Sequence, residues 1–362
     1  MTTLNEALLA WLEAHADGLD ADAAGGDGLL ARLAGAGLFR IGVPTDAGGS
    51  GGAFSASVRT VAALAETSLG VAFVFWAQRA VIECLLASPN RALADRLLPA
   101  LLEGRLAGAP GLSNAMKFLG GLDRLRASCA AGPDGLRLEG AVPWATNLHP
   151  QGFVVLIAAG DEHGDNPSVL AVPHHAQGVR REPDLDLLAL RGTHTAALRL
   201  DGVELDPAWQ LHRQARVFLP AIRPAFVGLQ CGLGLGLARA SIDAARRALE
   251  GRPSILDGEL AALEAEIEAA WQALSSGLDA GRLRERPREL LALRLRMVGI
   301  AAEAVALELQ ALGGRALLRG QDGGYARRAR EAAFLAVVTP TVAQLKGDLA
   351  KQAAQAAPPA NR

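Results

Sequence analysis

The sequence changes its periodicity twice, and this order constrains the fold more than any other feature. From Asn5 to about Gly104 apolar residues recur at helical intervals, and the strong helix formers Ala and Leu dominate. From about Ala107 to Leu205 Pro and Gly become frequent, and short runs alternate between apolar and polar residues. After Leu211 the helical pattern returns. The order helical, β, helical predicts segregated α+β layers and argues against an alternating βαβ sheet.

These changes of pattern divide the chain into three predicted domains. We expect an N-terminal helical domain over residues 1–106, a middle β domain over 107–208 and a C-terminal helical domain over 209–362. With 362 residues and 50% apolar content, the chain can bury a large core. Met297 to Leu312 is apolar nearly all round, which predicts a central, buried helix. The predicted strands of the middle domain include Leu136–Glu139, Phe153–Ile157, Val169–Val172 and Thr195–Leu200.

The charge balance and the length of the apolar runs exclude several kinds of partner. Lys and Arg total 36 against 38 Asp and Glu, so the net charge of -2 provides no overall field to hold nucleic acid or an anionic membrane. Residues 1–20 lack the basic and apolar regions of a signal peptide. Apolar runs such as Val71–Trp76 are far shorter than the roughly 20 residues of a membrane-spanning helix. We therefore expect a cytoplasmic protein without a membrane or nucleic-acid partner.

Short motifs do not identify a nucleotide or metal site. Gly232-Leu233-Gly234-Leu235-Gly236 resembles a dinucleotide-binding loop but follows no strand, so we interpret its glycines as allowing close helix packing. His174 and His175 are adjacent on a chain expected to be extended, so they point to opposite faces. The three cysteines are widely spaced and are interpreted as buried structural thiols. No metal site is predicted.

Five longer segments carry sequence signatures: Leu38–Gly52, Leu138–Asn147, Leu190–Pro207, Gln310–Gly314 and Arg330–Ala332. They include a Trp-x-Thr-Asn turn and a Gln-x-x-Gly-Gly segment, and Arg330–Ala332 is similar to an Arg-Asp-Ala helix. In this order along the chain, they resemble the signatures of the acyl-CoA dehydrogenase superfamily, and Arg252 stands where that family places an arginine. The resemblance implies a helical N-terminal domain, a middle β-barrel or sandwich domain and a C-terminal four-helix bundle.

The resemblance also implies a flavin cofactor, FAD, and assigns residues to it. Trp144 would lie against the isoalloxazine ring, although a core aromatic is the alternative, and Thr146 would lie near its reactive edge. Ser113 either contacts the flavin pyrimidine or is a surface-loop serine. The adenine and pyrophosphate part of FAD usually lies across a subunit boundary in this family, which implies a homodimer or homotetramer. Its expected contacts are Arg252, Gln310, Gly313 and Gly314.

The sequence departs from the family pattern at the catalytic base. Counting forward from Arg330–Ala332, Thr339 occupies the usual position of the glutamate that removes the α-proton of the substrate. A second position used by some members falls on Ile222 or Phe226, depending on the register, and both are apolar. Tyr325 or His194 could replace the base only if the fold brings them to the flavin. Ser113–Gly120 also departs from the family's Thr-Glu-Pro-x-x-Gly-Ser-Asp loop, and the usual Phe-Gly after the arginine is missing.

Three functions follow from this resemblance and its departures. The first is an FAD-dependent oxidoreductase acting on the CH-CH group of an acyl thioester, carried by CoA or an acyl-carrier protein, with a flavoprotein as a candidate electron acceptor. The second is a reduced-flavin-dependent monooxygenase, similar to dibenzothiophene and hydroxyphenylacetate monooxygenases, which share the fold without the glutamate. The third is a catalytically inactive paralogue that acts as a binding or assembly subunit.

Overall fold

The first third of the chain is a cluster of helices. The structure is a computed structural model, and it describes residues 4–132, 135–161, 163, 165–250 and 253–356. Its most buried helix is α4, which follows the N-cap Ser68; the Ser68 hydroxyl accepts a hydrogen bond of 3.3 Å from the N–H of Val71. The helices are α1 (Glu6–Ala21), α2 (Leu29–Gly35), α3 (Phe54–Thr67), α4 (Leu69–Ala87) and α5 (Arg91–Leu102), with short turns η1 (Ala23–Gly26), η2 (Leu38–Arg40) and η3 (Thr45–Ala47).

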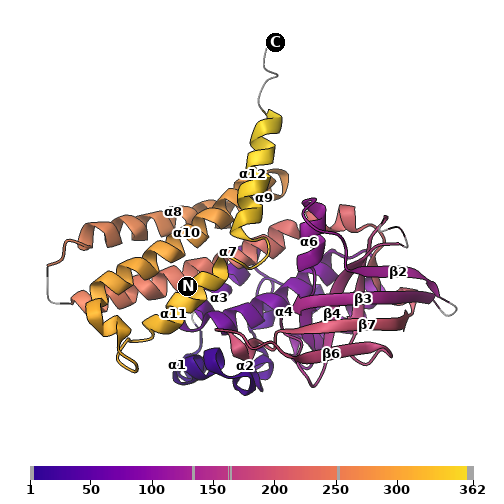
Figure 1. The fold of residues 1–362 in the computed structure, drawn as a ribbon, viewed down its shortest axis with the longest axis horizontal. Helices are drawn as coiled ribbons and strands as arrows, with labels where there is room; N and C mark the ends of the chain where they lie inside the picture. The colour runs from indigo at the N-terminus through magenta and orange to yellow at the C-terminus, as the bar shows by residue number, and fades with distance from the viewer. Residues whose placement is uncertain (1–3, 133–134, 162, 164, 251–252, 357–362) are drawn as a thin grey trace, which may run out of the picture.

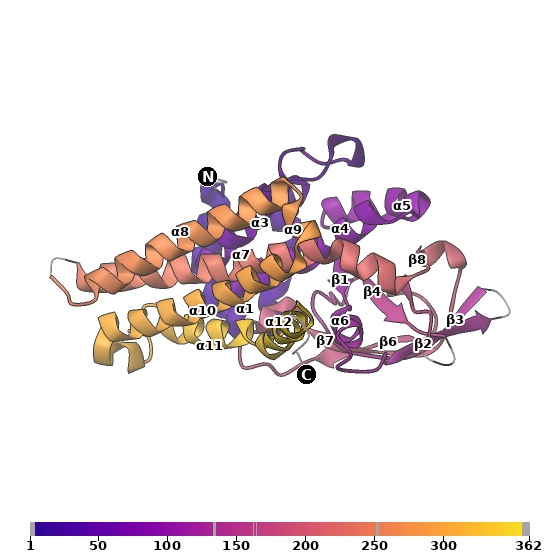
Figure 2. The same ribbon diagram turned by 90° about the horizontal axis from the view of Figure 1, so that it is seen from above.

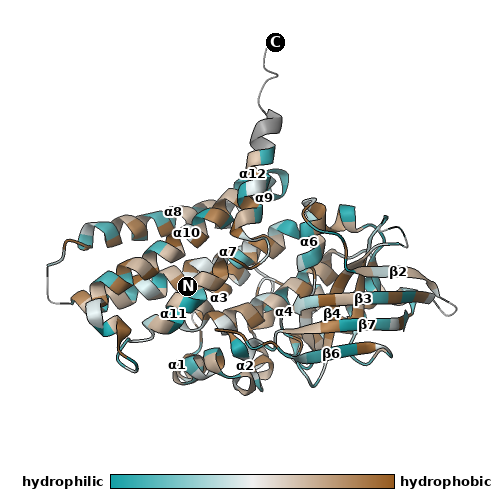
Figure 3. Cartoon of the chain, in the orientation of Figure 1, coloured by the Kyte–Doolittle hydropathy of each residue, from teal (hydrophilic) through white to brown (hydrophobic). Residues whose placement is uncertain are grey.

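The middle of the chain forms two four-stranded sheets, β1-β4-β5-β8 and β2-β3-β7-β6. β1 pairs with β4 in parallel, and the other named strand pairs are antiparallel. β4 and β5 are buried along their whole length, as the continuous apolar runs predicted. β6 is a sheet edge and is mostly hydrophilic (Figure 3). The strands are β1 (Ala107–Pro110), β2 (Ala127–Gly132), β3 (Gly135–Ala145), β4 (Phe153–Ala159), β5 (Ser168–Pro173), β6 (Val179–Asp184), β7 (Ala196–Leu205) and β8 (Gln210–His212).

The last part of the chain is helical again. Figures 1 and 2 show α7, α8 and α10 running side by side next to α3, at one end of the molecule, with the sheets at the other. The predicted α+β order is therefore confirmed. The elements of this part are α7 (Ala215–Leu249), α8 (Asp257–Asp279), α9 (Arg282–Glu285), α10 (Pro287–Leu312), η6 (Gly313–Leu317), α11 (Tyr325–Leu335) and α12 (Val342–Ala356). The middle region also contains the short helix α6 (Ser113–Leu119) and the turns η4 (Arg191–Thr193) and η5 (Pro207–Trp209).

The central, buried helices are α4 and α7. Both are long and apolar enough to span a membrane by length and composition, but 89% of the apolar stretch of each is buried inside the protein, as in a core helix. The prediction that Met297–Leu312 is buried all round was wrong, because this half of α10 exposes Ala302, Glu303 and Ala306. Alanine counts as apolar when a helix face is assessed from the sequence. Its small side chain has little area to remove from water, so an alanine-rich face can stay exposed.

The glycines of α7 allow close packing against two neighbouring helices. A Cβ atom on Gly232 would lie 2.6 Å from the carbonyl oxygen of Val58 in α3, and one on Gly236 would lie 2.1 Å from that of Ala62. On another face of α7, a Cβ on Gly234 would lie 2.9 Å from the carbonyl oxygen of Met297 in α10. The predicted packing role of these glycines is confirmed, and they let three helix backbones meet.

Gly236→Ala is expected to lower the free energy of unfolding by about 1–3 kcal/mol, because the added methyl group forces α7 away from the main chain of α3. Gly299→Ala is the matched control: Gly299 is an exposed glycine within α10, and an added Cβ would have no atom of the described residues within 4 Å. This control should be neutral or stabilising by up to about 1 kcal/mol. Chemical denaturation followed by circular dichroism measures both, and equal effects of the two variants would contradict the packing role.

Candidate functional site

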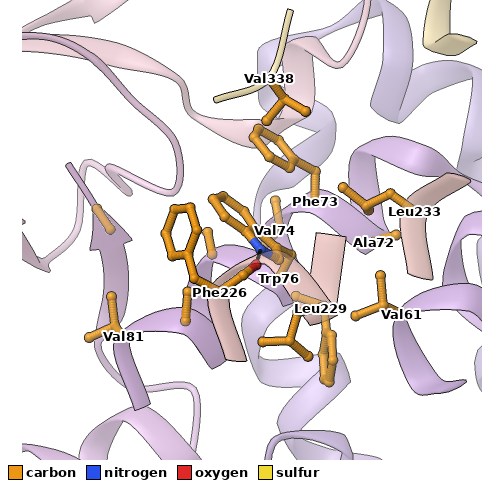
Figure 4. Close-up of a cluster of buried hydrophobic side chains, with 14 of the residues drawn as sticks. Val61, Ala72, Phe73, Val74, Trp76, Val81, Phe226, Leu229, Leu233 and Val338 are labelled. Carbon is orange, nitrogen blue, oxygen red and sulfur yellow. Dashed lines mark hydrogen bonds between the residues drawn. The ribbon is translucent and has the colours of Figure 1, made fainter. Parts of the chain in front are cut away.

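A cavity of about 670 Å³ lies where the β region meets α4, α7 and α11. This volume is within the range of about 300–1,000 Å³ that is common for small-molecule sites. One wall is aromatic: Phe73 and Trp76 of α4 stack with ring centroids 4.9 Å apart, and Phe226 of α7 meets Trp76 edge-on at the same distance (Figure 4). The indole N–H of Trp76 donates a hydrogen bond of 3.1 Å to the carbonyl of Phe226. The polar group of the Trp76 indole is therefore already paired within the wall.

Four residues singled out by the sequence line this cavity together. Trp144 is the penultimate residue of β3, Thr146 follows the strand, Ser113 begins α6, and Thr339 comes after α11. The Trp144 side chain is 56% exposed, so it is not a core aromatic. A large exposed ring on the wall of a cavity is a surface that a bound ligand can cover. The tertiary structure therefore brings together groups that are up to 226 residues apart in the sequence.

The turn that carries Trp144 and Thr146 is held from behind by Asn147. Asn147 has a left-handed backbone with φ of 66°, a conformation that asparagine tolerates better than most residues. Its side-chain amide donates hydrogen bonds of 2.9 Å to the Gln78 side chain and 3.0 Å to the carbonyl of Gly108. Gln78 was not identified from the sequence, although a lone buried amide in the apolar helix α4 is a signal for such a role.

A chain of hydroxyl groups gives Thr146 a defined hydrogen-bonding direction. Thr193 donates to the carbonyl oxygen of Leu190 at 2.7 Å, because a carbonyl can only accept. Thr195, 2.8 Å from Thr193, must then donate to it. Thr146, 3.0 Å from Thr195, is left to donate to Thr195. The Thr146 oxygen thus presents a lone pair and accepts a hydrogen bond from any donor on a ligand.

The charged groups on the cavity wall are mainly positive. Lys117 and Arg330 contribute cations, and Arg330 is held by the buried carboxylate of Asp20 at 2.5 Å. Among the described lining residues, only Asp186 has a carboxylate; its side chain is 87% exposed and forms an ion pair of 2.8 Å with Arg191. The wall can therefore attract an anionic ligand, but within the described residues it presents no buried carboxylate as a proton acceptor.

Comparison with known proteins relates this architecture to a known fold. Residues 3–105 match the acyl-CoA dehydrogenase N-terminal domain. Butyryl-CoA dehydrogenase from Megasphaera elsdenii has 17% sequence identity over 96% of this chain and 94% of its own, with a TM-score of 0.81. The chain therefore has the acyl-CoA dehydrogenase fold. The resemblance seen in the sequence is confirmed at this level. A search of curated proteins found no match.

Some similar solved structures are of proteins that are not named as acyl-CoA dehydrogenases. KijD3, solved in complex with dTDP, has 22% identity over 96% of this chain and 94% of its own, with a TM-score of 0.78. PigA, solved with FAD and proline, has 14% identity over 95% of this chain and 93% of its own, with a TM-score of 0.80. The fold therefore does not by itself select acyl thioesters as substrates.

Some residues expected at the flavin from the acyl-CoA dehydrogenase pattern lie away from this cavity. Gln310, Gly313 and Gly314 are exposed at the far end of α10 and in η6, and none lines the cavity. Arg252 lies outside the described residues. In one chain, the cavity is thus lined by Ser113 and the β-domain residues but not by Gln310, Gly313 or Gly314.

The alternative bases considered for this acyl-CoA dehydrogenase fold are also absent from the described cavity wall. Tyr325 begins α11 and His194 points toward Asp184, with 3.2 Å between its Nδ1 and the Asp184 carboxylate. Glu331 is buried, and it accepts hydrogen bonds of 3.0 Å from the N–H of Leu69 and 3.1 Å from Arg327. Burial raises the pKa of Glu331. Its contacts show a structural role at the start of α4.

Proposed function

We propose that this protein binds FAD in the cavity and acts as a flavin-dependent oxidoreductase. The observation that supports it most is the exposed Trp144 ring beside the Thr146 and Ser113 hydroxyl groups on one cavity wall. A flavin ring is flat and largely apolar with polar edges, and this wall offers aromatic surface and hydrogen-bonding groups of that kind. When bound, FAD supplies the acceptor or donor of a hydride or of electrons.

Each chain residue has a proposed task toward FAD. Trp144 covers the ring, Thr146 accepts a hydrogen bond from it, and Ser113 binds its polar edge. Asn147 and Gln78 keep the turn in place. The adenine and pyrophosphate part is assigned to Arg252, Gln310, Gly313 and Gly314 of a neighbouring subunit, since the last three lie away from the cavity within one chain.

The composition of the wall favours chemistry that needs no carboxylate base. Removal of an α-proton from an acyl thioester requires a basic group close to the substrate. Thr339, at the expected glutamate position, and Phe226, which with Ile222 is a candidate for the second position, both line the cavity, and neither side chain is basic near neutral pH. Among the candidate functions, this favours a reduced-flavin-dependent monooxygenase over α,β-dehydrogenation. Lys117 and Arg330 suit an anionic substrate, such as an acyl thioester carried by CoA.

The purified protein is expected to bind FAD, and Trp144→Ala should weaken binding about 3- to 10-fold through loss of aromatic contact. Trp144→Phe keeps a ring in place and is the matched control. Titration followed by flavin fluorescence measures both affinities. A colourless wild-type protein that ignores added FAD would refute the proposal and support an inactive paralogue.

A homodimer or homotetramer is part of this proposal. Leu317 is 78% exposed and Leu318 is 49% exposed, and both come shortly after the Gln310–Gly314 segment. Apolar side chains beside residues assigned to a neighbour's cofactor are suited to a subunit interface. Light scattering on the FAD-loaded sample used above gives the mass, and a monomer with FAD bound would overturn this assignment.

A further inference from the structure

We propose that Asp27, His149 and His194 form a binding site for one divalent transition metal ion of the Zn²⁺ class. The three residues come from the segment before α2, the turn after β3 and the turn after η4. One ligand atom from each lies within 4.8 Å of the others. Imidazole and carboxylate are the ligand types of zinc sites that keep one position for water.

The distances are close to those of a bound ion. The Asp27 carboxylate oxygen lies 3.7 Å from Nε2 of His194 and 3.9 Å from Nε2 of His149. Ligands at about 2.0–2.1 Å from zinc in a tetrahedral arrangement are about 3.3–3.4 Å apart. Small side-chain movements therefore close the site. The exposed side of Asp27 leaves access for the ion and for a water ligand, because its side chain is 63% exposed.

His194 is already oriented as a metal ligand. Its Nδ1 lies 3.2 Å from the Asp184 carboxylate, which can only accept a hydrogen bond, so the proton belongs on Nδ1 and the lone pair on Nε2. That Nε2 is buried and has no hydrogen-bond partner among the described residues. It faces the oxygen of Asp27, and two lone pairs at this distance repel each other unless a proton or a metal ion lies between them. A carboxylate behind a histidine is the usual support of a metal-binding imidazole.

His149 completes the site on the other side. Its ring packs edge-on against that of His194, with centroids 4.6 Å apart. Use of its Nε2 as a ligand requires the proton on Nδ1. This tautomer is easily reached, because the hydrogen bond that Nδ1 would otherwise accept from the N–H of Gln151 is long and weak at 3.4 Å. The neutral imidazole then offers a second nitrogen lone pair to the ion.

The chain makes room for this cluster at Gly26. A Cβ on Gly26 would lie 2.9 Å from Nε2 of His194 and 2.2 Å from the carbonyl oxygen of Gly192. The segment before α2 therefore approaches the η4 turn closely enough for Asp27 to reach both histidines. An ion there would join the N-terminal helices to the turns that carry Thr146 and Thr195 on their cavity side, so its role is to brace the cavity and not to take part in the reaction.

Zinc titration of the full-length protein tests the site. We expect wild type, freed of metal by a chelator, to bind one Zn²⁺ per chain in calorimetry and to gain thermal stability, which EDTA reverses. Asp27→Asn should weaken zinc binding about 10-fold or more, and Asp184→Asn about 10- to 100-fold through loss of support for His194. His175→Gln removes an exposed histidine elsewhere and should leave the affinity unchanged.

Co²⁺ gives a second readout, since visible absorption bands with the intensity of a four- or five-coordinate ion should appear in wild type and disappear in His149→Gln. The circular dichroism spectra of all variants show whether they are folded. Wild type that binds no zinc would overturn the proposal. Equal zinc affinity of folded Asp27→Asn and wild type would also overturn it.

Discussion

Wild-type protein is expected to dehydrogenate simple saturated acyl-CoAs poorly or not at all. Loss of a general base typically slows such a step about 10²- to 10⁴-fold, so trace turnover is compatible with this expectation. The physical reason is the wall of the cavity, where Thr339 occupies the expected base position, Phe226 is one of the two candidates for the second position, and the Asp186 side chain is exposed to solvent. A threonine hydroxyl has no appreciable basicity near neutral pH without an adjacent base.

Thr339→Glu tests this expectation by placing a carboxylate on the same wall. We expect it to increase dehydrogenation of at least one acyl-CoA in a panel of chain lengths, assayed with an artificial electron acceptor. Thr339→Gln has nearly the same size without the charge and should stay at the wild-type rate. Wild-type turnover at rates ordinary for enzymes would contradict the expectation. Absence of bound flavin in the purified protein would instead support an inactive paralogue.

Glu308→Ala is expected to lower the free energy of unfolding by about 3–5 kcal/mol. The Glu308 side chain of α10 is fully buried, and it accepts two hydrogen bonds from Nε of Arg328, of 2.9 and 3.2 Å, and another from its terminal nitrogen. Arg328 belongs to α11 and is 8% exposed, so removal of the carboxylate leaves a buried cation without its partner. The pair also fixes α11, which carries Arg330 and Phe334 on the cavity wall.

Two further variants distinguish loss of this pair from a general effect of mutation. The double variant Glu308→Leu with Arg328→Met should recover most of the stability, because neither charge is then left buried. Glu264→Ala breaks an exposed pair with Arg246 and should cost at most about 1 kcal/mol. Urea denaturation measures all three. Equal losses for Glu308→Ala and Glu264→Ala would show that the buried pair has no special role.

The sequence by itself determined the class of the fold and several of its elements. The change from helical to alternating periodicity placed the sheets between two groups of helices, since these patterns reflect local backbone geometry and the side of each element that is buried. The continuous apolar run Phe153–Ile157 identified a strand covered on both faces. The glycines of α7 were correctly interpreted as packing contacts because no strand precedes them. The same reasoning failed for Met297–Leu312, where alanines made an exposed face look apolar.

Only the tertiary structure decided which groups share a site. Thr339 meets Trp144 across one cavity, whereas His194, next to two cavity residues, turns its ring to the opposite side. Asn147 contacts Gln78, and Asp27 lies beside His149. Each pair is far apart in the sequence, so no short sequence motif could have predicted the contact. Periodicity records only whether a residue is buried and on which face of its own element. The contacts between distant elements depend on how their side chains pack, and packing is established only when the whole chain folds.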